Sequence, residues 1–167
     1  MHCKTGCSSV IEICMRYPYP SHRIHEIVRG RKCVREGETF EVNSKGERGA
    51  AFDVNLALMD DGPFSDPRYL GNTHDKAKPE GYASSLLLGG QKVRGVDYHA
   101  VGQRRWYKQC IPPGWHQDLL DPNLPTRHED HHRREALPHF APTDFMDFIA
   151  RTAKLWNIDL GLEESML

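Results

Sequence analysis

Long hydrophobic runs are missing from this chain of 167 residues. No run approaches the roughly 20 apolar residues that a membrane-spanning helix needs, and Met1–Cys7 lack the apolar stretch of a signal peptide. An excess of one charge is missing as well, since 22 lysines and arginines stand against 23 aspartates and glutamates. We therefore expect a cytoplasmic protein without a membrane span, a secretion signal or a polybasic tail.

A disulfide framework is not expected, because the five cysteines are an odd number and no secretion signal accompanies them. Cys3 and Cys7, with His2, have a spacing that could hold a metal ion, but no second Cys/His pair follows at zinc-finger distance. A frayed N-terminus is the favoured interpretation, and we expect residues 1–9 to be mobile.

Several catalytic signatures are also missing. The chain has no P-loop, no glycine-rich dinucleotide fingerprint after a strand and no Gly-x-Ser-x-Gly nucleophile elbow. Enzyme classes that depend on these motifs are therefore not indicated.

Alternating hydrophobicity is the clearest positive signal. Ala51–Leu58 places Phe52, Val54, Leu56 and Leu58 on one face, which predicts a half-buried strand. Gly89-Gly90 separates two β-prone runs, Tyr82–Leu88 and Gln91–His99, and predicts a hairpin because glycine tolerates the positive φ of tight turns.

The other segments are predicted from weaker patterns. Strands are expected at Val10–Arg16, at Phe40–Val42 and at Arg105–Cys110, a turn at Asn43–Gly46 and a long loop at Met59–Glu80. Ser21–Arg35 fits either a short helix with Ser21 as N-cap or a strand, and its β-branched composition favours the strand.

One helix is expected near the C-terminus. Thr143 or Asp144 can act as N-cap, and an apolar stripe at helical spacing runs from Phe145 to Trp156. Strands followed by such a helix indicate a single α+β domain over residues 1–167: an antiparallel sheet of about five to seven strands, with the C-terminal helix packed on one face. Residues 111–142 show no periodicity and are expected to form a long loop rich in proline and histidine, unless an element is hidden there.

Basic residues gather in two stretches, His22–Arg35 and Gln91–Lys108. If these stretches pair in the sheet, they create one positive face that suits phosphates. The candidate nucleic-acid contacts are Lys92, Arg94, Tyr98, Arg104, Arg105, Tyr107 and Arg133, because cations hold phosphates and aromatic rings stack on unpaired bases. The alternative is a solvated sheet face whose arginines protect an edge from aggregation.

Ten histidines are many for this length. Imidazole can donate and accept a proton near neutral pH, so a metal-independent ribonuclease needs little more than two such groups and a cation. We expect His99 and His116, near predicted strand ends, and His128 in the loop to be the catalytic candidates. A metal site at His128, His131 and His132 is a weaker alternative because the spacing matches no established motif.

The resulting hypothesis is a small intracellular protein that binds or acts on RNA or DNA, in its sharpest form a metal-independent nuclease of toxin or defence type, with no cofactor. The rival hypothesis is a non-enzymatic module that uses the charged face and the long loop to bind a protein partner. The sequence indicates neither the substrate nor the oligomeric state.

Overall fold

A computed structural model describes residues 21–59, 67–101, 103–104, 110–121 and 132–162. The elements in chain order are α2 (Ser21–Arg29), β1 (Lys32–Val34), β2 (Asn43–Lys45), β3 (Gly49–Leu58), β4 (Pro67–Thr73), η1 (Pro79–Gly81), β5 (Ala83–Leu88), β6 (Gln91–His99), β7 (Gln103–Arg104), β8 (Cys110–Ile111), β9 (Gly114–Leu120), β10 (His132–Ala136), α3 (Phe145–Leu155) and β11 (Ile158–Asp159). The predicted strand at Val10–Arg16 and the mobile segment at residues 1–9 lie outside this described part.

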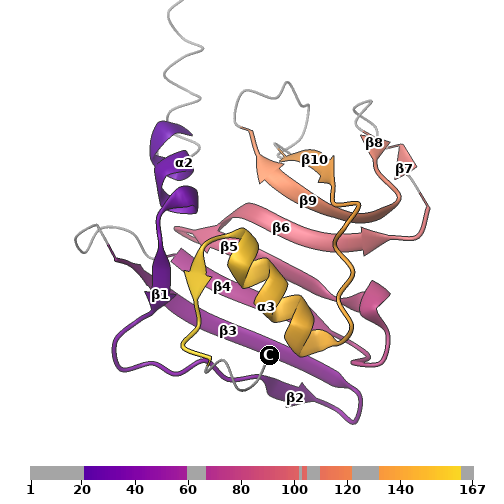
Figure 1. Ribbon diagram of the computed structural model, residues 1–167, viewed down its shortest axis with the longest axis horizontal. Helices are drawn as coiled ribbons and strands as arrows, with labels where there is room; N and C mark the ends of the chain where they lie inside the picture. The colour runs from indigo at the N-terminus through magenta and orange to yellow at the C-terminus, as the bar shows by residue number, and fades with distance from the viewer. Residues whose placement is uncertain (1–20, 60–66, 102, 105–109, 122–131, 163–167) are drawn as a thin grey trace, which may run out of the picture.

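A large sheet dominates the fold, with α3 lying across one face (Figure 1). Its strands follow the order β10-β9-β6-β5-β4-β3-β1-β11, and β2 pairs with β3. Neighbouring strands are antiparallel except β1 and β11, which are parallel. The predicted α+β class is therefore confirmed, but the sheet has nine strands instead of five to seven.

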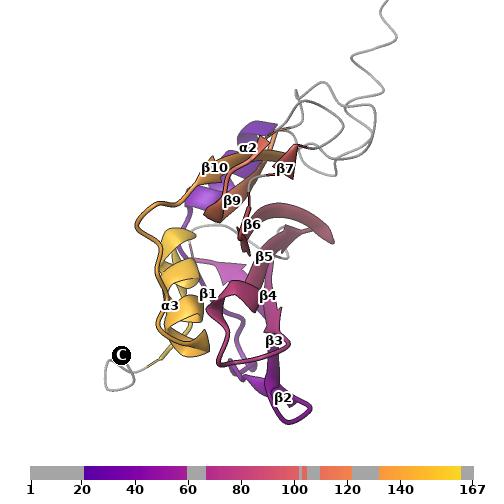
Figure 2. The same cartoon turned by 90° about the vertical axis from the view of Figure 1, so that its right-hand side faces the viewer.

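The C-terminal helix forms where the sequence predicts it. Asp144 is its N-cap and accepts a hydrogen bond from the Asp147 backbone N–H at 2.9 Å. The helix lies on one side of the sheet (Figure 2). Its buried residues include Phe145, Phe148 and Ile149. The stripe extends to Trp156, which is buried as predicted, but Leu155 is exposed and does not belong to it.

Strand β3 and the β5–β6 hairpin confirm two further predictions. Phe52, Val54 and Leu56 are buried on the face that packs toward α3, where the rings of Phe52 and Phe145 lie 6.2 Å apart. Gly89 and Gly90 have φ angles of 56° and 79°, a conformation that residues with a Cβ rarely adopt.

The strand predicted for Ser21–Arg35 is wrong over its first part, which forms α2. Ile24 and Ile27, three residues apart, are both buried, as one face of a helix requires. Lys32 then donates from Nζ to the carbonyl oxygens of Ile27 and Val28, at 2.9 Å each. The last turn of α2 is thus closed by a lysine from the following strand β1.

Two predicted loops contain strands. Residues 59–80 include β4, in which every second residue is buried: Pro67, Tyr69, Gly71 and Thr73. The sequence does not show this alternation as hydrophobicity, because proline and glycine occupy two of the buried positions. Residues 111–142 include β9 and β10, whose charged residues face both sides of the sheet and so show no apolar period. The strand predicted at residues 40–42 is also wrong, because β2 begins at Asn43, inside the predicted turn.

None of the helices in the described part of the chain is long and apolar enough to cross a membrane.

Candidate functional site

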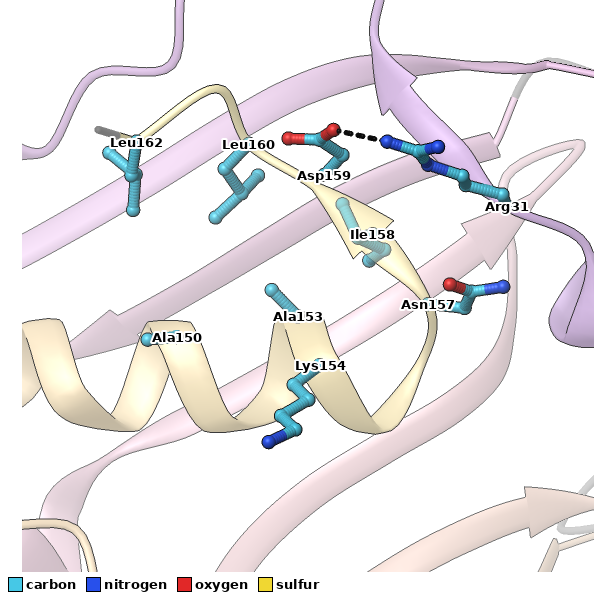
Figure 3. A pocket seen from close by; sticks show the side chains of 9 residues that line it. All are labelled: Arg31, Ala150, Ala153, Lys154, Asn157, Ile158, Asp159, Leu160 and Leu162. Atoms are coloured by element: carbon cyan, nitrogen blue, oxygen red, sulfur yellow. Dashed lines mark hydrogen bonds and ion pairs between the residues drawn. The ribbon is translucent and has the colours of Figure 1, made fainter. Parts of the chain in front are cut away.

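Two pockets lie near β11, at one edge of the sheet. The first, about 340 Å³, lies between α3 and β11 (Figure 3). It is lined by Arg31, Ala150, Ala153, Lys154, Asn157, Ile158, Asp159, Leu160 and Leu162. Within it Arg31 is paired with Asp159 at 3.0 Å. The second, about 490 Å³, shares Asp159, Leu160 and Leu162 with the first. Neither lining includes a histidine, so these pockets do not contain the predicted catalytic residues.

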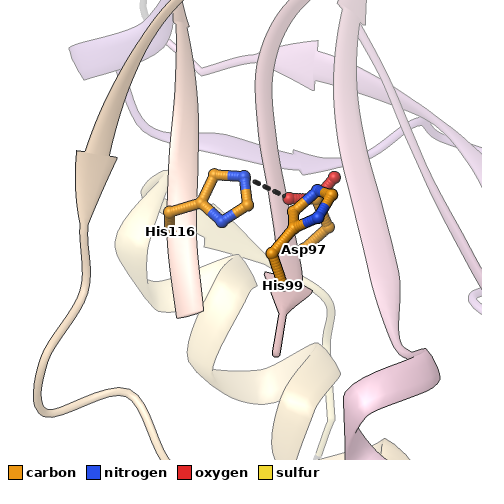
Figure 4. Close-up of side chains that lie close together, drawn as sticks. All are labelled: Asp97, His99 and His116. Carbon is orange, nitrogen blue, oxygen red and sulfur yellow. Dashed lines mark ion pairs between the residues drawn. The ribbon is translucent and has the colours of Figure 1, made fainter. Parts of the chain in front are cut away.

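The pairing of β6 with β9 brings together side chains that are distant in the sequence. In this antiparallel ladder Asp97 is directly opposite His116, and His99 is opposite Gly114. Strand alternation directs Asp97, His99 and His116 to one face of the sheet and Tyr98 and Trp115 to the other. The ring of Trp115 lies 5.6 Å from that of Phe148 in α3, so the three polar side chains occupy the face turned away from this helix (Figure 4).

Asp97, His99 and His116 form a compact group, which we call the His–Asp–His cluster. Nε2 of His116 lies 2.6 Å from Oδ1 of Asp97, and the two imidazole rings are 5.1 Å apart between centroids. One nitrogen or oxygen atom from each residue falls within 4.8 Å of the other two. The cluster is therefore small enough for all three groups to act on a single bound atom or group.

Exposure differs sharply within the cluster. The side chain of His116 is 1% exposed and that of Asp97 is 38% exposed, while His99 is half-buried. A dissolved ligand can therefore reach Asp97 and His99, whereas His116 lies behind them.

A network of opposite charges from β6, β9 and β10 supports the cluster. Buried Asp118 is paired with Nζ of Lys92 and lies 3.3 Å from Nε of Arg134, which is buried too. Its Oδ1 is also 3.9 Å from Nε2 of His116. The residues therefore alternate in charge across three strands, from Asp97 through His116 and Asp118 to the two cations.

The charges shift the pKa values of the cluster in opposite directions. Burial alone raises the pKa of Asp97, but His116, Lys92 and His99 outweigh it and leave the pKa below its usual range. Burial alone lowers the pKa of His116, but Asp97 and Asp118 outweigh it and leave the pKa above its usual range. At neutral pH Asp97 is therefore a carboxylate, and its negative charge stabilises the protonated form of His116.

Sequence reasoning found the two histidines and missed the carboxylates. His99 and His116, predicted as a pair, lie together. Asp97 and Asp118 gave no signal of their own, because a single aspartate in a strand is typical of a solvated sheet face. Their importance follows only from the β6–β9 register.

Some of the other predicted site residues lie outside the described part of the chain, and others are described. His128, His131, Arg105 and Tyr107 lie outside the described residues, and only the backbone of Arg104 is described. His132 is in β10 and its Nε2 lies 2.9 Å from the carbonyl oxygen of Lys92.

The predicted positive face does not form as expected. Strands β3, β4 and β5 separate β1 from β6, so the two basic stretches do not pair. Lys92 is on the side of the cluster, whereas register places Arg94, Tyr98 and Arg133 on the opposite face. Arg94 is 8% exposed and donates to the Val93 carbonyl oxygen at 2.7 Å, which leaves it poorly placed to hold a phosphate.

Comparisons of the chain with protein-family models, with curated proteins and with solved structures found no match in any of the three.

Proposed function

We propose that this protein binds nucleic acid and acts on its phosphodiester backbone at the His–Asp–His cluster. The observation that carries the proposal is the convergence of Asp97, His99 and His116 on one sheet face, backed by the ion-paired Asp118. Removing charged groups from water costs free energy, and replacing a buried ion pair by apolar residues often leaves a protein as stable as before. Stability alone therefore does not explain this cluster. Groups with perturbed pKa values gathered in this way are typical of functional sites.

Solvent access assigns different roles to the cluster residues. His99 and Asp97 can meet a substrate, and His99 can take a proton from a 2′-hydroxyl group as general base. The 2′-oxygen then bonds to the neighbouring phosphorus, the bond from phosphorus to the 5′-oxygen breaks, and the leaving oxygen takes up a proton from solvent. Asp97 is ionised at neutral pH, and because its lowered pKa makes it a weak base, its role is to stabilise positive charge on His99. His116 lies behind Asp97 and is a positioning residue for that carboxylate.

The charge of the site face favours an anion. Lys92 and Arg134 neutralise Asp97 and Asp118 on this face, and His116, whose pKa is raised, adds a positive charge when it is protonated. The protonated site would attract phosphate groups. The proposal keeps the nucleic-acid hypothesis that was derived from the sequence. It uses fewer cations than the sequence predicted.

Affinity for single-stranded RNA at 50 and 200 mM salt tests the proposal. One phosphate contact, for the partly exposed Lys92, predicts a salt slope of about −0.7 and hence a loss of affinity of about 2.6-fold between these concentrations, since buried Arg134 cannot reach a phosphate. Lys92→Ala should weaken binding and reduce the slope by about 0.7. Lys154→Ala, which removes an exposed cation on α3, is the matched control and should leave both quantities unchanged.

Absence of measurable RNA affinity at either salt concentration contradicts the proposal, and so does affinity that Lys92→Ala leaves unchanged. Either result would favour the rival hypothesis of a module that binds a protein partner.

A further inference from the structure

We propose that Asp97, His99 and His116 are the ligands of a divalent transition-metal ion of the zinc type. Two imidazoles and one carboxylate are a ligand set that suits zinc and its first-row neighbours and does not suit magnesium or calcium. Three protein ligands leave a coordination position open for water or substrate, as in catalytic zinc sites. The inference names the cofactor of the proposed site, so its catalytic meaning rests on the proposed function. With the ion bound, His99 would be a ligand, and the proton acceptor would be the water at the open position in place of His99. Metal binding can be tested alone.

The distances are within reach of a shared ion. Ligands bound at about 2.0–2.2 Å around a tetrahedral centre lie roughly 3.4 Å from one another. The 2.6 Å between His116 Nε2 and Asp97 Oδ1 must therefore widen by less than an ångström, by roughly 0.8 Å. The ligand atoms all lie within 4.8 Å of one another, so the longest separation must shorten by at most about 1.4 Å. The partly exposed side chains of Asp97 and His99 can make these small rotations, while buried His116 stays in place.

The surroundings of His116 match those of a metal-bound histidine. Such a histidine commonly donates its second ring N–H to a backbone carbonyl or a carboxylate, which fixes the tautomer and leaves the other nitrogen for the ion. Here Nδ1 of His116 lies 3.5 Å from the carbonyl oxygen of Gly114, and Nε2 faces Asp97. The strand itself therefore presents Nε2 to the centre of the cluster.

Two buried carboxylate oxygens form a second, independent observation. Oδ1 of Asp97 and Oδ1 of Asp118 are inaccessible to solvent and have no well-aligned hydrogen-bond donor among the described residues. Both lie near Nε2 of His116, at 2.6 and 3.9 Å. Their partners are ion pairs alone, His116 for Asp97 and Arg134 at 3.3 Å for Asp118. An ion held between Asp97 and His116 would give the Asp97 oxygen the well-aligned partner that it lacks, and Asp118 would support the site from outside.

Titration of the full chain with Zn²⁺ against a chromophoric chelator tests the inference. The wild-type protein should bind one ion tightly, and His99→Ala and Asp97→Asn should each weaken that binding by ~100-fold or more. Asp118→Asn, which alters only the outer support, should weaken it by ~10–100-fold. His139→Ala and His74→Ala remove exposed histidines elsewhere and should leave the affinity unchanged. Circular dichroism checks that each variant is folded, and Asp97→Asn, which keeps the side-chain shape, supplies the test if His99→Ala is unstable.

Substitution with Co²⁺ provides a second measurement, because the visible spectrum of the bound ion reports its ligands. A spectrum that changes in His99→Ala and in Asp97→Asn supports direct ligation. Zn²⁺ affinity that is unchanged in both variants overturns the inference, as does affinity that is lost in His128→Ala and retained in His99→Ala.

The failures of the two proposals can be told apart. RNA binding that persists in the presence of EDTA, without tight Zn²⁺ binding, overturns the metal site and leaves the proposed function standing. Tight Zn²⁺ binding at the cluster without RNA affinity overturns the proposed function and leaves the metal site standing.

Discussion

The amine of Lys32 predicts an unusual alkaline stabilisation of this protein. Its side chain is 0% exposed, and burial, assisted by the nearby charge of Arg94, lowers its pKa from 10.5 to about 8. Between these two values the unfolded chain still holds the proton that the folded protein has released. The free energy of unfolding therefore rises with pH across this window, because the unfolded state binds more protons.

The size of this effect follows from the shift of about 2.5 pH units. At about 1.4 kcal/mol per unit, the wild-type protein should gain about 3 kcal/mol relative to Lys32→Met between pH 8 and pH 10.5. The measurement is urea unfolding of both proteins at several pH values, since the titrations that they share cancel in the difference. Arg94→Met removes one cause of the lowered pKa, so it should raise the pKa of Lys32 and reduce the gain.

A difference between the two proteins that stays constant from pH 8 to pH 10.5 would refute this reasoning. It would mean that the carbonyl oxygens of Ile27, Val28 and Gly30, which accept hydrogen bonds from Nζ at 2.6–2.9 Å, keep the ammonium group charged despite burial.

Three further substitutions test the packing, each by urea or thermal unfolding. Phe148→Ala should cost about 3–5 kcal/mol, because the ring is fully buried; a loss below 1 kcal/mol would contradict its place in the core. Asp144→Ala should cost about 1 kcal/mol by removing the N-cap of α3, whereas an unchanged stability would show that the cap contributes nothing. Gly71→Ala should cost about 1–3 kcal/mol, since the new Cβ would lie 2.6 Å from Cε1 of Phe52; a stabilised variant would show that the ring is free to move.

Local patterns explain which elements the sequence predicts. Strand β3 and helix α3 can be predicted because their apolar residues recur at regular spacing along the sequence. In β3 these residues are Phe52, Val54 and Leu56, all of which are buried. Strand β4 is different, because it is stabilised by neighbours that are distant in the sequence. Gly71 lies under the ring of Phe52, and the hydroxyl of Tyr69 donates to the Ile149 carbonyl oxygen at 3.1 Å. A proline or glycine in such a strand looks like a loop residue until its partner strand is known.

The candidate site divides in the same way. His99 and His116 could be found because the acid–base chemistry of imidazole is evident from the residue type alone and both lie near predicted strand ends. Asp97 and Asp118 acquire their role only through the register of β6 with β9, which no local pattern contains. The positive face failed for a related reason, since strand order decides which charges share a face and three strands separate the two basic stretches.

Cleavage of a single-stranded RNA that carries a fluorophore and a quencher tests the central claim most directly. The assay compares wild-type protein with His99→Ala and with the control His139→Ala, each with added Zn²⁺ and with EDTA. The account predicts cleavage by the wild-type protein in at least one condition, a loss of ~10²–10⁴-fold in rate for His99→Ala and an unchanged rate for His139→Ala. No cleavage by folded wild-type protein in either condition, or a rate for His99→Ala equal to that of the wild-type protein, would contradict it.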